Sequence, residues 1–301
     1  MIDVRNVSKS FEDTLAVDKV SFQIKEGAVF GLIGVNGAGK STLLRLMSGI
    51  YRADEGVILI DDDPVFDNVS AKKKIFYISD EQYYLDNATL VDIRNYYQMI
   101  YETFDSSRFD RMIRDVELDP QKKIHTYSKG MRKQLSMITG VCSGASYLLC
   151  DETFDGLDPV MRQMIKNLLT YEIAHREFAP VIASHNMREL EDICDHVGLL
   201  YRGGMLLSRD VQDMKLRIHK AQCVFREEED AEKAFAGLDL ISRECRGSLY
   251  TITARGNKEQ LISSITAVNP LFYEILPLTL EEIFKYFFGI QISFLFIQTI
   301  S

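Results

Sequence analysis

The stretch Gly34-Val35-Asn36-Gly37-Ala38-Gly39-Lys40-Ser41-Thr42 fits the pattern G-x-x-x-x-G-K-[ST] of a phosphate-binding P-loop. A triphosphate needs backbone N–H groups directed at it, and glycine tolerates the positive φ angles and close approach that this requires. In such a loop the ammonium of Lys40 contacts the β- and γ-phosphates, and the hydroxyl of Ser41 faces Mg²⁺. The stretch therefore predicts a nucleoside triphosphate site.

The flanks of this loop predict the fold. Residues 28–33 read as a buried strand and residues 41–47 as the start of a helix, so the helix N-terminus faces the phosphates. Further apolar runs alternate with helical patterns along the chain. They are residues 147–150, 179–184 and 197–201. This alternation predicts an α/β fold with a parallel sheet and with its chemistry at the carboxyl ends of the strands.

Composition limits the class of protein. The chain has 301 residues, of which 46% are hydrophobic and 26% are charged, and its formal net charge is −9. This acidity disfavours nucleic acid as the main partner, because binding to a phosphate backbone needs clustered Lys and Arg. The five cysteines are widely spaced and form no CxxC pair, so we expect reduced thiols. The N-terminus begins with strand-like alternation, so we expect no export of this chain.

Two carboxylates follow the apolar run at 147–150. Asp151 is expected to hold Mg²⁺, usually through water. Glu152 comes next, and the alternation of side chains along a strand would direct it to the other side, beside the γ-phosphate. A carboxylate there can activate water. This pair is therefore expected to meet the P-loop at the strand ends.

The segment between the strand-like run at 75–78 and the apolar run at 147–150 is expected to be helical. Residues 89–104 and 105–120 both carry apolar residues at helical spacing. The acidic triplet at 61–63 is expected to be a solvated turn. Phe11, which lies ahead of the P-loop, is either a core residue or a platform on which a nucleotide base stacks.

Five motifs in order make the chain resemble the ATP-binding subunits of ABC transporters over residues 1–215. Besides the P-loop, they are the signature Tyr127–Leu135, the Walker B strand Tyr147–Asp151 with Glu152, the D-loop Asp155–Asp158 and the histidine switch Ser184–Asn186. The resemblance implies a P-loop fold of the ABC type with an inserted helical subdomain at about 86–140.

The resemblance also assigns roles to residues. It implies catalysis by Glu152, His185 and Lys40, and Mg²⁺ held by Ser41, Asp151 and Asp80. The ATP-binding residues that it implies are Phe11, Gly34, Asn36, Gly37, Ala38, Gly39, Lys40, Ser41, Thr42, Ser128 and Gly130. Ser128 precedes a helix, so its hydroxyl and the free helix N–H groups form an anion site. In the family this site closes over the γ-phosphate held by a second subunit.

The sequence departs from the family pattern at two places. In the signature, Lys129 replaces a Gly and Met131 replaces the Gln. In the Q-loop, Asp80 stands where the family often has Gln, and Gln82 lies two residues later. We favour Asp80 as the residue that contacts Mg²⁺, with Gln82 in a shifted loop as the alternative.

The pattern changes after residue 208. A β-α-β-β-α-β order follows, which predicts a small α+β, ferredoxin-like accessory domain at 216–288. The apolar tail at 289–301 is shorter than the ~20 residues that span a bilayer. It is expected to pack on its own domain or a dimer mate, or to contact a membrane subunit or the bilayer surface.

These inferences predict the ATPase of an ABC transporter, of the export type, on the cytoplasmic face of the cell membrane. Its expected partners are membrane-spanning subunits and a second ATP-binding subunit, which forms either a homodimer or a heterodimer with this chain. No nucleic acid is expected as a partner. One alternative is a soluble ABC ATPase that acts on nucleic acid or ribosomes. Another is a regulator that binds ATP without hydrolysing it; the altered signature favours this, and the intact Lys40, Asp151, Glu152 and His185 oppose it.

Overall fold

The computed structural model describes residues 1–288, which fall into two compact units. The first is Met1–Ser208, and the second begins at Arg209. The predicted apolar tail at 289–301 lies outside the described residues. Among the helices of residues 1–288, none has both the length and the apolar character needed to cross a bilayer. We describe each unit by itself.

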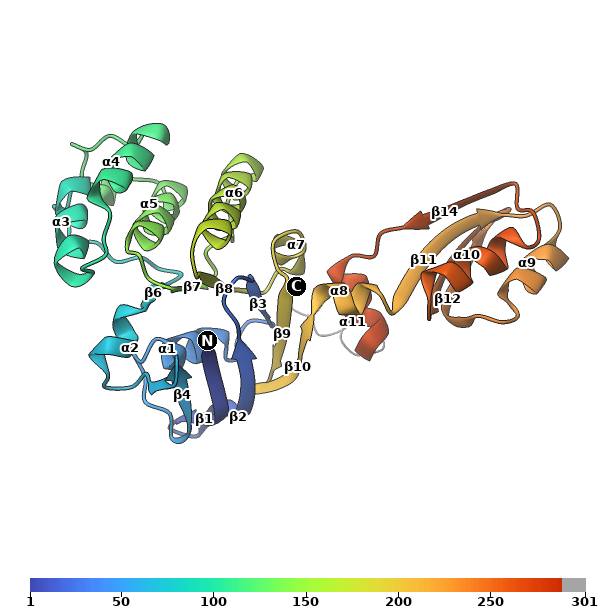
Figure 1. The fold of residues 1–301 in the computed structure, drawn as a ribbon, viewed down its shortest axis with the longest axis horizontal. Coiled ribbons are helices and arrows are strands. Elements are labelled where there is room, and N and C mark those ends of the chain that lie inside the picture. Colours follow the sequence, from blue (N-terminus) through green and yellow to red (C-terminus); the bar gives the residue numbers. More distant parts are fainter. Residues whose placement is uncertain (289–301) are drawn as a thin grey trace. The chain divides into compact units, whose positions relative to one another are not determined.

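A six-stranded sheet forms the centre of the first unit (Figure 1), in the order β10-β9-β3-β8-β7-β6. Neighbouring strands from β9 to β6 are parallel. All residues of β3, β7 and β8 are buried, which is typical of a parallel sheet covered on both faces. The strands are β3 (Phe30–Ile33), β6 (Ile75–Ile78), β7 (Tyr147–Asp151), β8 (Ala179–Ser184), β9 (His196–Tyr201) and β10 (Gly204–Asp210). The predicted α/β fold is confirmed.

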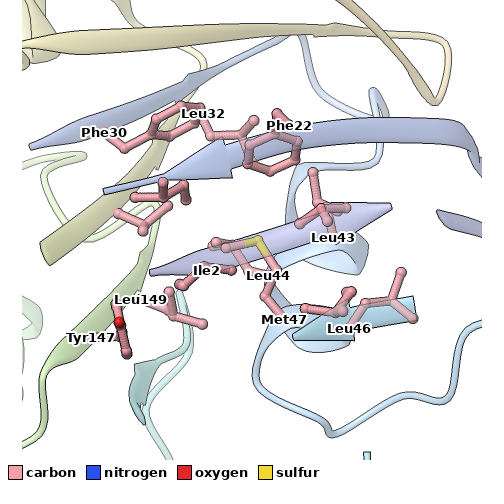
Figure 2. Packing of buried hydrophobic residues seen from close by; sticks show 14 of the residues in the cluster. Ile2, Phe22, Phe30, Leu32, Leu43, Leu44, Leu46, Met47, Tyr147 and Leu149 are labelled. Carbon is pink, nitrogen blue, oxygen red and sulfur yellow. The ribbon is translucent and has the colours of Figure 1, made fainter. Parts of the chain in front are cut away.

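A second sheet packs with α1 (Lys40–Met47) around the main core of this unit. Its order is β2-β1-β4-β5, from β1 (Ile2–Phe11), β2 (Thr14–Ile24), β4 (Glu55–Ile60) and β5 (Asp63–Pro64). Figure 2 shows the core. Its labelled residues are Ile2, Phe22, Phe30, Leu32, Leu43, Leu44, Leu46, Met47, Tyr147 and Leu149. Since α1 contributes four of these, the core fixes the helix that begins at the end of the P-loop.

The turn between β4 and β5 is more than a solvated acidic loop. Asp61, at φ 50°, accepts hydrogen bonds from Lys74 at 2.7 Å and from the N-terminal amino group of Met1. Burial raises the pKa of Asp61, but the hydrogen bonds from these two cations outweigh it and hold the pKa well below its usual range. The expectation of solvated acids is therefore wrong for Asp61, whose ion pairs tie the turn to the chain.

The predicted helical segment has its own apolar cluster. It consists of α3 (Leu90–Ile100), α4 (Ser106–Asp115), a 3-10 turn at Ile124–Thr126 and α5 (Lys129–Cys142), which lie together in Figure 1. Thr89 begins α3 with a capping box, and Asp105 caps α4. The second helix ends five residues before the predicted Pro120, because Glu117 adopts a left-handed φ of 56°.

A buried carboxylate joins this helical segment to α6 (Pro159–His175). Glu172 of α6 is 1% exposed. It accepts hydrogen bonds from Arg108 of α4 and, at 2.6 Å, from the Nε of Arg176. Two guanidinium groups thus compensate one buried charge, as burial of an ion requires. The remaining helices of the first unit are short: α2 (Val69–Lys73) and α7 (Met187–Leu190).

The second unit is built on the antiparallel sheet β12-β13-β11-β14. The six predicted elements occur in the predicted β-α-β-β-α-β order, after α8 (Val211–Lys215) and before α11 (Leu280–Phe288). They are β11 (Ile218–Val224), α9 (Glu228–Phe235), β12 (Asp239–Arg246), β13 (Leu249–Arg255), α10 (Lys258–Thr266) and β14 (Phe272–Leu276). Helices α9 and α10 share one apolar cluster with the sheet. The chain therefore carries a β-rich region beyond its P-loop fold.

Candidate active site

The P-loop connects β3 to α1, and its glycines are required by its shape. Gly37 and Gly39 have φ angles of 77° and 102°. A Cβ atom at Gly39 would lie 2.3 Å from the carbonyl oxygen of Ala16, and one at Gly34 would lie 2.6 Å from that of Leu200. Any side chain at these two positions would therefore displace backbone. The loop and the first turn of α1 contain the predicted residues Gly34, Asn36, Gly37, Ala38, Gly39, Lys40, Ser41 and Thr42.

Lys40 is a buried cation surrounded by oxygen atoms. Its side chain is 5% exposed. Its Nζ donates hydrogen bonds to the carbonyl oxygens of Gly34 at 2.7 Å and Val35 at 3.3 Å. It also lies 3.1 Å from Oε1 of Glu152. Phosphate oxygens can replace such partners, since an ammonium binds them as a point charge.

Glu152 lies between Lys40 and His185. Its Oε1 faces Lys40, and its Oε2 lies 2.8 Å from Nδ1 of His185. We expected strand alternation to direct it there, and this reason is wrong. The strand β7 ends at Asp151, and Glu152 turns the chain with a left-handed φ of 48°. The left-handed turn, and not the alternation of a strand, therefore sets the direction of the Glu152 side chain.

His185 comes directly after β8, and a small polar network fixes its loop. The hydroxyl of Ser184 donates to Oε2 of Glu189 at 2.8 Å and accepts from the backbone N–H of Asn186 at 2.9 Å. The ends of β7 and β8 and the loop after β3 thus bring Glu152, His185 and Lys40 together. This is the arrangement expected of an acid–base group placed beside a phosphate site.

Asp151 and Ser41 form the candidate metal site. The Ser41 hydroxyl donates to Oδ1 of Asp151 at 2.9 Å, so the two predicted ligands are adjacent. Within residues 1–288 no cluster of three His, Cys, Asp or Glu residues is placed to hold a metal alone. The hydroxyl of Ser41 and the carboxylate of Asp151 are two hard oxygen donors. This number suits Mg²⁺, which binds through one or two protein groups together with substrate phosphates and water. Metal binding here remains a prediction.

Tyr77 on the neighbouring strand β6 was missed by the sequence reasoning. Its hydroxyl donates to the second carboxylate oxygen of Asp151 at 3.1 Å. It also accepts from Nε of Arg45 at 3.4 Å. Burial, followed by the charge of Asp151, raises the pKa of Tyr77 to about 12, so its proton stays available as a donor. The only signal in the sequence was its place in the strand that precedes the Q-loop.

Asp80 and Gln82 follow β6. Oδ1 of Asp80 is buried without a hydrogen-bond partner among the described residues. Gln82 donates from its amide to the carbonyl oxygen of Ser79 at 2.9 Å. In the described part of the chain neither side chain is hydrogen-bonded to Ser41 or Asp151, so the role of Asp80 as a metal ligand remains a prediction.

Phe11 is a partly exposed aromatic residue at the end of a strand, and the signature residue Ser128 begins a helix. Phe11 ends β1, is 40% exposed and meets the ring of Tyr51 edge-on at 5.2 Å. Ser128 caps α5, because its hydroxyl accepts from the N–H of Met131 at 3.2 Å. Gly130 lies in the first turn of this helix. Base stacking and phosphate binding at these residues remain predictions.

Replacing Asp151 with Asn is expected to stabilise the chain and to abolish Mg²⁺-dependent nucleotide hydrolysis. Burial, followed by the charge of Glu152, raises the pKa of Asp151 despite the hydrogen bonds from Ser41 and Tyr77. A raised pKa means that folding favours the protonated carboxyl group. The contribution of Asp151 to stability is therefore fully present below its unfolded pKa, and it is lost as the pH rises through its folded pKa. At pH 7 the neutral amide should raise the unfolding temperature by roughly 2–4 °C. A thermal scan and a phosphate-release assay check the two effects; a lower unfolding temperature would contradict the first.

Comparisons with known proteins agree with the sequence resemblance. A family model described as "ABC transporter" matches residues 17–155. The ABC transporter ATP-binding protein YtrB of Bacillus subtilis (strain 168) is 30% identical over 289 residues, which cover 96% of this chain and 98% of that protein. The methionine import ATP-binding protein MetN of Clostridium tetani (strain Massachusetts / E88) is 29% identical over 230 residues, which cover 72% of this chain and 71% of that protein.

Solved structures show the same fold. The structure of an ATP-binding subunit of an ABC transporter matches with a TM-score of 0.66 and 22% identity, covering 71% of this chain and 92% of that chain. A dimeric bacterial ABC transporter cassette matches with a TM-score of 0.64 and 20% identity, covering 70% of this chain and 99% of that chain. At such identities these structures bear on the fold alone.

Proposed function

Because this chain belongs to the ATP-binding subunits of ABC transporters, we propose that its ATP hydrolysis powers substrate translocation by separate membrane subunits. The chain is an ABC ATPase, which converts ATP and water to ADP and phosphate. The observation that carries the proposal is the position of Glu152, whose carboxylate lies 3.1 Å from Nζ of Lys40 and 2.8 Å from Nδ1 of His185.

These residues divide the chemistry among them. Glu152 orients a water and accepts its proton as the water oxygen attacks the γ-phosphorus. Lys40 and the N–H groups of the P-loop balance the charge on the phosphate oxygens. His185 holds the Glu152 carboxylate and contacts the γ-phosphate. Mg²⁺, when bound, neutralises charge on the β- and γ-phosphates, and Ser41 and Asp151 are the residues that would hold it.

ABC cassettes dimerise and pair with membrane subunits. We propose that the capped N-terminus of α5 closes over ATP bound to a second subunit, because a helix N-terminus attracts anions. For the membrane subunits, we propose docking beside the Q-loop on the inner face of the cell membrane. Tyr83 and Leu85, which follow the Q-loop, are 84% and 69% exposed, as suits residues covered by a partner.

For the direction of transport we propose export. The support is the resemblance of residues 280–284 to the last short helix of export-type subunits. Import is the alternative, because MetN of Clostridium tetani is a methionine import protein. Uptake and release by sealed vesicles that contain the complete transporter distinguish the two.

Co-purification from detergent-solubilised membranes tests the proposal. We expect a polytopic membrane protein to accompany the chain at a fixed ratio. Tyr83→Asp should weaken this association, whereas Val69→Asp should not, although Val69 is also highly exposed, at 70%. Recovery of ribosomes, nucleic acid or the chain alone would contradict the transporter assignment and would favour a soluble ABC ATPase.

A further inference from the structure

Lys133 is a buried lysine that the proposed mechanism leaves without a role. It lies on α5 and is 1% exposed, although lysine is almost never fully buried unless it is paired. Its Nζ donates to two backbone carbonyl oxygens, that of Glu152 at 2.8 Å and that of Asp155 at 2.7 Å. In the described residues it forms no ion pair with a carboxylate, so these two carbonyl groups are its partners.

The two carbonyl groups belong to the turn that carries the catalytic carboxylate. Glu152 has a left-handed φ of 48°, and its N–H donates to the carbonyl oxygen of Ala183 at 3.1 Å. Its own carbonyl oxygen also accepts a long hydrogen bond, 3.3 Å, from the N–H of Asp155. The ammonium of Lys133 therefore holds both ends of the turn from Glu152 to Asp155. The direction of the Glu152 carboxylate depends on that turn.

The cost of burying this charge argues against a passive packing role. Burial and then the charge of Lys129 lower the pKa of Lys133, against the opposing charges of Asp155, Asp80 and Glu189. A methionine would fill a similar space without the cost of removing a charged group from water. A charged group in this position is useful only where its hydrogen bonds are needed.

We propose that Lys133 is a positioning residue that holds Glu152 in its catalytic geometry and links the signature helix to the catalytic carboxylate of the same chain. The inference rests on the proposed function. Helix α5 begins at the Ser128 cap, and Lys133 follows about 7.5 Å along the axis, at 1.5 Å per residue. One rigid element thus joins the end expected to meet the partner's ATP to the turn that carries this chain's own base.

The link continues along the same helix. The hydroxyl of Ser136, close to one turn beyond Lys133, lies 2.8 Å from the hydroxyl of Tyr84, in the segment that follows the Q-loop. Helix α5 is therefore attached by side chains to two segments, the turn from Glu152 to Asp155 and the segment that follows the Q-loop. Displacement of α5 would move the Glu152 turn through the hydrogen bonds of Lys133. The contact of Ser136 is with Tyr84 and does not reach that turn.

The test compares Lys133→Met and Lys133→Gln with Thr139→Val in the full-length chain. Thr139 is a matched control, because it lies on α5, is also 1% exposed and donates only to Leu135 of its own helix. We expect K133M to lower kcat on the order of 10²-fold, because small misplacement of a catalytic group has that effect. Equilibrium ATP binding should stay within about threefold of the original chain. K133Q, which retains two N–H donors, should recover part of kcat, and T139V should keep it.

The outcomes separate the two proposals. Turnover by the unmodified chain together with an unchanged kcat in K133M would overturn the positioning role and leave the ATPase assignment intact. Equal losses of kcat and ATP binding in K133M would overturn it as well, because they indicate general disruption. If K133M does not fold, the test rests on K133Q. Faster amide hydrogen exchange at residues 152–157 together with a reduced kcat would support the positioning role. Unchanged exchange and an unchanged kcat would refute it. Absence of Mg²⁺-dependent turnover in the unmodified chain would overturn the proposed function itself.

Discussion

Replacing Glu152 with Gln is expected to lower kcat for ATP hydrolysis by about 10²–10⁴-fold, the contribution typical of a positioned general base. The amide keeps the shape of the side chain and cannot accept the proton of the attacking water. ATP binding should survive, since the P-loop supplies its own contacts through Lys40, whose partners include Gly34 and Val35 as well as Glu152. Phosphate release under saturating ATP and Mg²⁺, with ATP affinity measured separately, checks both expectations.

A matched control for this prediction is Glu55→Gln, which makes the same chemical change at an exposed position of β4. Its kcat should equal that of the original chain. A dimer trapped by ATP in E152Q, seen as a doubled mass in sedimentation, would support closure of two subunits around the nucleotide. Unchanged turnover in E152Q with ATP bound would show that another group is the base.

Replacing Lys40 with Met is expected to weaken ATP binding roughly 10–100-fold, from the loss of charged hydrogen bonds worth about 1.5–3 kcal/mol. The side chain is 5% exposed and approaches three oxygen atoms, so its methylene stem is already packed and Met can occupy the space. Turnover should fall at least as far, because the same ammonium is the group proposed to balance charge on the γ-phosphate. Titration with a fluorescent ATP analogue measures the loss of affinity.

Lys25→Met is the control for the loss of a positive charge, because Lys25 is exposed and follows β2. It should bind ATP as the original chain does at physiological ionic strength. If K40M and K25M bound ATP equally well, the assignment of Lys40 to the phosphates would be wrong. A similar unfolding temperature in both variants would show that the lost affinity of K40M does not come from unfolding.

Much of the first unit could be predicted, because its signals are local. The glycine pattern of the P-loop and the apolar run that ends at Asp151 each determine a short segment. The helix start at Ser128 was also readable from a single residue, and the structure shows that the Ser128 hydroxyl caps α5.

What could not be predicted depends on contacts between distant segments. Tyr77 contacts Asp151 because β6 and β7 pair in a parallel register, which leaves no mark in either strand alone. Lys133 reads as one more polar residue of a helix until the fold buries it. The left-handed turn at Glu152 was hidden for a similar reason, since glutamate has no local preference for that conformation.

The buried Glu172 has a mechanical consequence. Helix α6 begins right after the D-loop, and Glu172 lies thirteen residues further along it, or about 20 Å at 1.5 Å per residue. Its bond to Arg108 fastens the far end of this rod to the inserted helices. Helix α6 therefore connects the inserted helices at its far end to the D-loop at its N-terminus, so loss of the Arg108–Glu172 ion pair should free the far end of α6 from the inserted helices.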